Sequence, residues 1–222
     1  MISGERSMPR NWSTTAVSIS PQPRRLGQVV RSRPFLLLYS SWVCATTALF
    51  VPFVFLPAFA RRYGVDPVAA SALLSVIGAM SIFGRAGMGP LGHWVGTLRL
   101  FRIAVFLMAA SYLLWLSTTS YPGLLAFAAV LGLGYGIRIA LMPAVLIEFF
   151  GLANLGALLG TFFTASGVAA FIGPLAAAAI VDHMGGFAWG IGFALALGSL
   201  GFIMLVPLHP APAQQRVARR AG

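Results

Sequence analysis

Two arginines lie inside stretches of sequence that otherwise carry no charge. Arg85 follows the uncharged run 69–84, and Arg138 is the only charged residue in the run 122–147. A guanidinium holds a carboxylate through two parallel hydrogen bonds, so such arginines are suited to binding a small organic anion. Because placing an arginine in hydrocarbon costs about 2.5–3.5 kcal/mol on insertion scales, we expect these positions to be functional.

The face around Arg85 is small or polar. Ser81 precedes Arg85 by one helical turn and shares this face with Gly78 and Met88. We expect Ser81 and Arg85 to point into a helix bundle and to contact the substrate. The alternative is that Arg85, about seven residues from the end of its apolar stretch, reaches the membrane interface and only anchors the helix.

Arg138 lies nearer the middle of its stretch, within the segment GLGYGIR. We expect Arg138 and Tyr135 to bind or gate the substrate. The alternative is a structural role, in which Arg138 pairs with Glu148 or with backbone carbonyls, although ten residues of helix, about 15 Å, separate the two charges. Thr161 and Thr164 are further candidate substrate contacts, and their alternative role is to bond to backbone carbonyls of their own helix.

The composition indicates an integral membrane protein. Of 222 residues, 59% are hydrophobic and 9% are charged, against about 25% charged in soluble domains. The net charge of +11 does not indicate nucleic-acid binding, because the arginines flank the apolar stretches as they do in membrane proteins. The single cysteine, Cys44, excludes an internal disulfide and a cysteine-based metal cluster. Since hydrolase and metal-binding motifs are absent from the sequence, we expect no enzyme, no metal and no cofactor.

Six apolar stretches are each long enough for a membrane-spanning helix. Their approximate ranges are 35–60, 67–92, 98–117, 122–147, 155–181 and 187–207. Short links that contain Gly or Pro join them, so consecutive helices are expected to be antiparallel neighbours. The prediction is an all-α integral membrane protein with a six-transmembrane-helix bundle over 34–208. Residues 1–33 are expected to form a disordered basic cytoplasmic tail or linker, and residues 209–222 a second cytoplasmic tail.

Arginine counts at the two ends of the bundle predict its orientation. An even number of spans, six, places both tails on the same side of the membrane. That side holds nine arginines, whereas the other side holds two, Arg61 and Arg62. Arginine-rich flanks stay in the cytoplasm, so both termini are expected there, with the bundle in the inner or plasma membrane. The Arg61–Arg62 pair is a mild departure from this rule.

The second and fifth stretches are similar to each other. Both begin with Ala-Leu-Leu, at 72 and 157, and reach Gly-Pro-Leu, at 89 and 173. If the six helices divide as three plus three, these two cross the membrane in opposite directions, which is the pattern of an inverted repeat in secondary transporters. The alternative is chance similarity between two helices rich in Ala, Gly and Leu.

Three segments resemble motifs of a known family. GPLGHWVGTLR at 89–99 resembles the loop motif between the second and third helices of each half of a major facilitator superfamily transporter. GYGIRIALMPAVLIEFFG at 134–151 resembles the fourth helix, and GPLAAAAIVDHMGG at 173–186 resembles the end of the fifth. The chain therefore resembles the C-terminal six-helix half of such a transporter, within the monocarboxylate-transporter-like group.

The resemblance also implies roles for individual residues. His93 stands where the loop motif has Asp, and Ser81 stands where the group often has an acid four residues before the arginine that Arg85 matches. The usual acid–arginine pair for proton coupling is therefore missing. Gating or structural roles are implied for Gly89, His93, Gly96, Arg99, Glu148 and Asp182.

The function that the resemblance implies is secondary-active transport of a small organic anion, similar to a monocarboxylate, by one half of a carrier. Complete carriers of this family have twelve helices in two halves. The implied partners are therefore the lipid bilayer, the anion, and a second six-helix half or a second copy of this chain. The alternative is a non-transporting or truncated membrane module that serves as the partner subunit of another half.

Overall fold

The structure, a computed structural model, describes residues 26–87 and 95–209, and all regular elements in these ranges are helices. Six helices are long and apolar enough to cross a membrane, which confirms the predicted six-span all-α bundle. A short helix that the sequence did not predict, α1, lies within the segment assigned to the N-terminal tail. The elements are α1 Leu26–Val30, α2 Arg33–Arg62, α3 Pro67–Ala86, α5 Thr97–Ser117, α6 Tyr121–Phe150, α7 Leu155–Met184 and α8 Phe187–Leu205.

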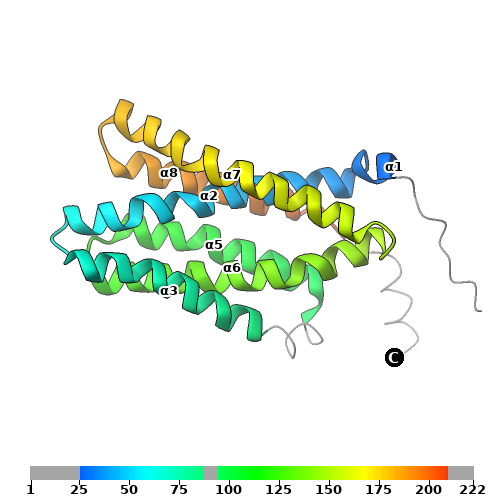
Figure 1. Cartoon of the computed structure of the whole chain (residues 1–222), viewed down its shortest axis with the longest axis horizontal. Helices are drawn as coiled ribbons and strands as arrows, with labels where there is room; N and C mark the ends of the chain where they lie inside the picture. The colour runs from blue at the N-terminus through cyan, green and yellow to red at the C-terminus, as the bar shows by residue number, and fades with distance from the viewer. Residues whose placement is uncertain (1–25, 88–94, 210–222) are drawn as a thin grey trace, which may run out of the picture.

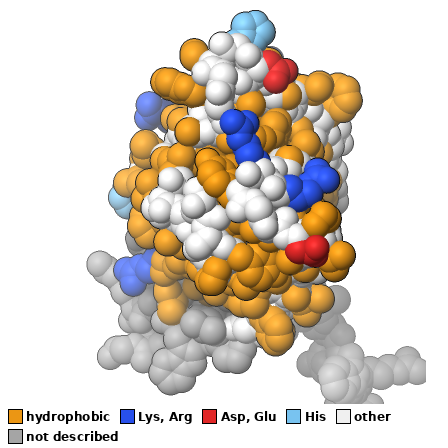
Figure 2. Space-filling model, turned by 90° about the vertical axis from the view of Figure 1, so that its left-hand side faces the viewer, with side chains coloured by type: hydrophobic (Ala, Val, Ile, Leu, Met, Phe, Trp, Pro, Cys, Tyr) orange, Lys and Arg blue, Asp and Glu red, His pale blue; other side chains and the backbone are white. Residues whose placement is uncertain are grey.

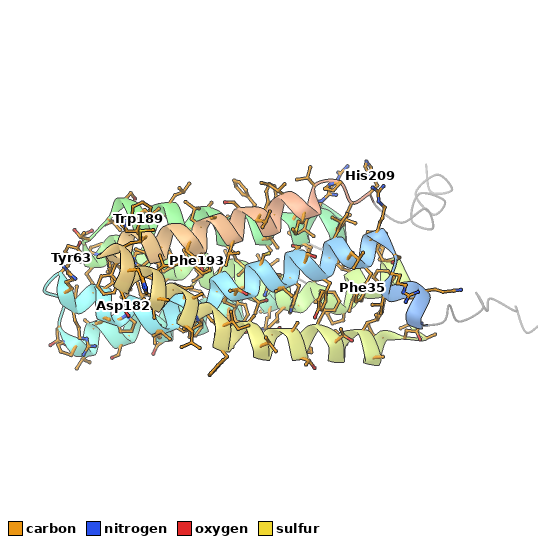
Figure 3. The ribbon with its side chains drawn as sticks, turned by 90° about the horizontal axis from the view of Figure 1, so that it is seen from above. Phe35, Tyr63, Asp182, Trp189, Phe193 and His209 are labelled. Atoms are coloured by element: carbon orange, nitrogen blue, oxygen red, sulfur yellow. The ribbon has the colours of Figure 1, made fainter. Side chains whose placement is uncertain are left out.

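The long helices run side by side along the long axis of the molecule (Figure 1). The links 63–66, 118–120 and 185–186 lie together at one end, which we name the hairpin end. Tyr63 and Trp189 lie at this end, whereas Phe35 and His209 lie at the opposite end (Figure 3). At the start of α3, Asp66 caps the helix by accepting hydrogen bonds from the backbone N–H groups of Val68 and Ala69, as expected for an N-cap residue.

Two long helices, α2 and α6, organise the packing. Helix α2 packs against α7 and α8, and helix α6 packs against α3 and α5. Contacts between α5 and α8 and between α2 and α3 join the two groups. Two aromatic-rich clusters fill the interior, one around Trp42 and Phe162 and the other around Trp115 and Phe127. The centre of the bundle therefore lies between α2 and α6.

Glycines allow α6 to approach α3 at backbone distance. A Cβ atom at Gly132 would overlap the backbone of Ile77, and one at Gly136 would overlap the carbonyl of Ser81. Such small residues at a spacing of four let two membrane helices pack closely. Because Arg138 lies two residues after Gly136 in a buried helix, this contact fixes the depth at which its side chain enters the bundle.

Candidate functional site

Arg138 is almost fully buried, with 1% of its surface exposed. Its Nη2 donates a hydrogen bond of 2.8 Å to the hydroxyl of Thr46 on α2. The guanidinium also lies over the ring of Trp42, with Cζ 4.1 Å from the ring centroid. This is a short cation–π contact, which contributes about 2 kcal/mol when both groups are removed from water. Two residues of α2, one helical turn apart, therefore hold a cation that α6 carries.

Trp42 is itself fixed by α7. Its Nε1 donates to the hydroxyl of Ser166 at 2.8 Å and to the carbonyl of Phe162 at 3.1 Å. The hydroxyl of Ser166 in turn donates to the carbonyl of Phe162 at 3.0 Å. Because the indole has little freedom to rotate, the guanidinium stacked on it is held in one orientation between three helices.

A cavity of about 90 Å³ lies at this junction. Its described lining carries one formal charge, that of Arg138, and no acidic side chain. Two nitrogens of the guanidinium, Nε and Nη1, have no hydrogen-bond partner among the described residues. Buried charges are ordinarily paired and hydrogen-bonded, so an unpaired one beside a cavity is suited to receiving an anion. The lining residues are Trp42, Thr46, Leu49, Phe50, Tyr135, Arg138, Ile139, Phe163 and Ser166.

Of the residues expected to contact substrate, Tyr135 joins Arg138 in this cavity. Tyr135 is half-buried and lies one turn before Arg138 on α6. Thr161 and Thr164 do not join them. Both are exposed on α7, and their hydroxyls donate to the carbonyls of Ala157 and Gly160, which is the alternative role that the sequence left open.

Arg85 and Ser81 also lie outside the cavity lining. Arg85 is exposed in the last turn of α3, while Ser81 is buried and its hydroxyl donates to the carbonyl of Gly78 at 2.8 Å. The two arginines nevertheless lie at a similar level of the bundle. Gly84 packs against the backbone of Ile137, since a Cβ at Gly84 would lie 3.0 Å from the backbone nitrogen of Ile137. These two residues directly precede Arg85 and Arg138 in the sequence. Arg138 therefore points into the bundle, whereas Arg85 is presented at its surface.

The residues expected to gate or to form the loop motif are spread over several ends of helices. Gly89 and His93 lie outside the described residues. Gly96 adopts a positive φ of 87° as the N-cap of α5, and Arg99 is exposed in the first turn of that helix. Glu148 is half-buried near the end of α6, and Asp182 is exposed in the last turn of α7.

Sequence reasoning missed the partners of Arg138. The neighbouring Thr47 is not one of them, because its hydroxyl donates to the carbonyl of Val43 in its own helix. Trp42 and Thr46 lie on the same face of α2, one turn apart, and this spacing was a signal that could have identified them. What the sequence did not show is that this face meets α6.

Arg102 has a role that arginine counting did not reveal. Its Nε donates to the carbonyl of Leu205 at 3.0 Å, and its Nη2 donates to the carbonyls of Val206 and Leu208. The last carbonyls of a helix have no intrahelical donor. Arg102 on α5 therefore caps the C-terminal end of α8. No group of three or more His, Cys, Asp or Glu side chains able to hold a metal was found in the described parts of the chain.

Comparisons with known proteins agree with this architecture. The family model described as Major Facilitator Superfamily matches residues 44–222. The chain is 30% identical to "Monocarboxylate transporter 4" of Rattus norvegicus, over 73% of this chain and 36% of that protein. It is 32% identical to "Monocarboxylate transporter 3" of the same organism, over 70% of this chain and 33% of that protein. An "MFS-type transporter" of Gibberella moniliformis is 29% identical, over 79% of this chain and 44% of that protein.

The match thus spans less than half the length of each of these curated relatives. The family model covers most of the six-helix bundle, including the segment of α2 from Cys44 and all of α6 and α7. The relatives are named as transporters, two of them as monocarboxylate transporters. The family match, the six apolar helices and the similarity to these proteins lead to one assignment: the chain is a multi-pass membrane protein that belongs to the Major Facilitator Superfamily.

Proposed function

We propose that this chain forms one half of a secondary-active carrier that moves a small organic anion, similar to a monocarboxylate, across a membrane. The observation that carries the proposal is the buried guanidinium of Arg138, which lies beside a cavity and has two nitrogens without partners among the described residues. Removing an ion from water costs several kcal/mol unless an opposite charge compensates. A carboxylate bound in the cavity would supply that charge and would accept hydrogen bonds from the free nitrogens.

The cavity restricts which anions fit. Its volume, taken as the space open to the centre of a water molecule, is about 90 Å³, and a single water needs about 10–15 Å³ of such space. The space therefore suits a carboxylate with only a short side chain. The aromatic walls formed by Phe50 and Phe163 suit an apolar remainder, whereas a second carboxylate would find no second cation in the described lining. The site thus favours a monoanion over a dianion.

Arg85 supports the proposal that a second half completes the carrier. Arg85 is exposed and lies level with Arg138, from which α6 continues for about 12 further residues. On the surface of this bundle alone, the side chain of Arg85 would therefore face lipid. The helix that carries it, α3, and its counterpart α7 are also poorly covered, with 28% and 22% of their most apolar segments buried, against 56% in α2 and α6. A second half, or a second copy of this chain, packed on these faces would bring Arg85 to the path between the halves.

The pattern of helix packing supports the proposed division into three plus three. Exchanging α2, α3 and α5 with α6, α7 and α8 converts the most extensive helix contacts into one another: α2 with α7 becomes α6 with α3, and α2 with α8 becomes α6 with α5. The smaller contact of α7 with α8 has no counterpart of similar extent between the described parts of α3 and α5. Inverted repeats of this kind are how many secondary transporters alternate access to a central site.

The proposed orientation has both termini in the cytoplasm. It rests on the arginine excess at the end opposite the hairpin end. Single cysteines introduced at positions 20 and 215, with Cys44 replaced by Ala, test it by labelling in intact and opened cells. Both positions should react with a membrane-impermeant maleimide only after the cells are opened, and reaction of either one in intact cells would contradict the proposal.

Uptake of labelled lactate and pyruvate by cells that express the chain tests the transport proposal. Arg138→Gln should abolish uptake. Arg138→Lys should impair it, because lysine keeps the charge but loses the planar fork. Arg85→Gln should also impair uptake if the surface of α3 lines the path. Arg61→Gln is the matched control, since Arg61 is exposed and lines neither cavity of the described structure.

Two outcomes would contradict the proposal. Normal uptake by Arg138→Gln would show that the buried cation does not contact substrate. Absence of uptake by the wild-type chain, expressed alone and together with a six-helix N-terminal half of a relative, would instead favour the alternative of a non-transporting partner module.

A further inference from the structure

Arg62 lies at the hairpin end, where the transport proposal leaves the Arg61–Arg62 pair without a role. It lines a cavity of about 230 Å³ formed where the ends of α2, α5 and α8 meet. Its neighbour Arg61 is exposed and does not line this cavity. The two adjacent arginines therefore differ in one respect that an experiment can use: only Arg62 faces the cavity.

The N-terminus of α8 forms a second part of the wall, through Gly186, Phe187 and Ala188. Gly186 is the N-cap and provides no side-chain hydrogen bond, and the first turn of α8 contains no acidic residue. The first N–H groups of a helix lack intrahelical acceptors, and this end carries about half a positive charge, so it attracts anions. The guanidinium of Arg62 lies over the ring of Phe187, 5.6 Å from Cζ to the centroid, which places both positive groups together.

Trp115 provides an independent indication of a ligand. Its side chain is fully buried and forms part of the cavity wall. Its Nε1 has no hydrogen-bond partner among the described residues, although a buried indole N–H normally has one. Packing against Phe59 and Phe127, with centroid distances of 5.8 and 4.8 Å, holds the ring in place. A residue of the wall thus carries a buried donor that nothing in the described chain satisfies.

The rest of the described lining supplies a further donor and no competing negative charge. Thr119 contributes a hydroxyl group, whereas the hydroxyl of Thr118 is hydrogen-bonded to Ser120. No acidic side chain is among the described lining residues. Asp66 and Asp182 are exposed at the same end but do not line the cavity. Figure 2 views this end, where the few basic and acidic side chains are set among hydrophobic ones. The cavity is therefore positive and rich in donors within an apolar surface.

We propose that this cavity is an anion site that binds a single oxyanion group, a phosphate or a carboxylate, through Arg62, the N-terminus of α8 and the indole N–H of Trp115. The oxyanion has two possible sources, the headgroup of a phospholipid at the membrane surface or a soluble anion. Arg138 lies 17 residues after Tyr121, the first residue of α6, which is about 25 Å of helix from this end. The site is thus separate from the Arg138 cavity and does not depend on the transport proposal.

The test uses the full chain purified in detergent, with two probes. The first probe is inorganic phosphate, whose binding is measured by equilibrium dialysis with labelled phosphate. The second is phosphatidylglycerol added to the delipidated protein, with the retained lipid counted by native mass spectrometry. Arg62→Gln should weaken binding of the effective probe by about tenfold or more, because it removes a charge-assisted hydrogen bond to the oxyanion. Arg61→Gln, the matched control, should bind within twofold of the wild type.

Further variants distinguish binding in this cavity from binding elsewhere on the protein. Trp115→Phe keeps the ring and removes only the N–H, so it should weaken binding about threefold while the thermal midpoint shows that the protein is folded. Arg138→Gln should leave the Arg62-dependent binding intact. Binding of both probes would identify a soluble anion as a sufficient ligand, and binding of phosphatidylglycerol alone would identify a lipid headgroup. Equal binding by Arg61→Gln and Arg62→Gln, or no binding of either probe by the wild type, would overturn the proposal.

Discussion

Replacing Arg138 by methionine separates a binding role from a structural one. Methionine has a similar length and no charge, so it fills the site without requiring a counter-ion. The substitution removes the hydrogen bond to Thr46, at 2.8 Å, and the cation–π contact with Trp42, at 4.1 Å. A hydrogen bond to a charged group contributes about 1.5–3 kcal/mol, and a desolvated cation–π contact about 2 kcal/mol. The loss is therefore about 3.5–5 kcal/mol.

The same substitution removes the cost of burying an uncompensated ion. That cost is several kcal/mol for a guanidinium whose Nε and Nη1 have no partner in the described part of the chain, and it is of the same size as the loss. We therefore expect Arg138→Met to be as thermally stable as the wild type, or more stable, when no ligand is present. A bound anion should reverse the order, because a ligand at 100 times its dissociation constant stabilises only the protein that binds it, by about 2.7 kcal/mol.

Thermal unfolding in detergent, with and without lactate or pyruvate, measures both effects. Lactate or pyruvate should raise the midpoint of the wild type and leave that of Arg138→Met unchanged, with potassium chloride at equal ionic strength as the control. Since 1 kcal/mol corresponds to about 2–4 °C for a protein of this size, the ligand shift is measurable. A fall of more than about 5 °C in the ligand-free midpoint of Arg138→Met would refute the reasoning, because it would show that Arg138 is mainly a structural contact between α2 and α6.

Two further predictions concern the packing that positions the site. Gly136→Val should destabilise the bundle by about 2 kcal/mol or more and lower its thermal midpoint, because a side chain there would overlap the carbonyl of Ser81. Gly160→Val is the control, since a Cβ at Gly160 meets nothing within 4 Å; equal destabilisation by both would contradict the close α3–α6 contact. Arg102→Gln should lower the midpoint by the equivalent of about 1.5–3 kcal/mol by releasing the carbonyls at the end of α8, such as that of Leu205. An unchanged midpoint would mean that water replaces this cap.

The sequence by itself determined the membrane class, the six helices and the family. These properties depend on local features, because a bilayer requires each spanning segment to satisfy its own backbone hydrogen bonds over about 20 apolar residues. The N-cap at Asp66 is local in the same way, because an aspartate directly before a proline is typical of the start of a helix. The two arginines could be identified for the same reason, since a charge in an apolar run is visible without knowing what surrounds it.

Only the tertiary structure decided which arginine is buried and what it contacts. Helices such as α6 are apolar on all sides, so their pattern does not show which face meets another helix. The partners of Arg138 lie on α2, 92 residues earlier in the case of Thr46, and the partner carbonyls of Arg102 begin 103 residues later, at Leu205. Such pairs form between helices that are distant in the sequence and become neighbours only in the folded bundle. The direction of a side chain in a membrane bundle is therefore set by which helices pack against it, and its own sequence neighbourhood does not contain that information.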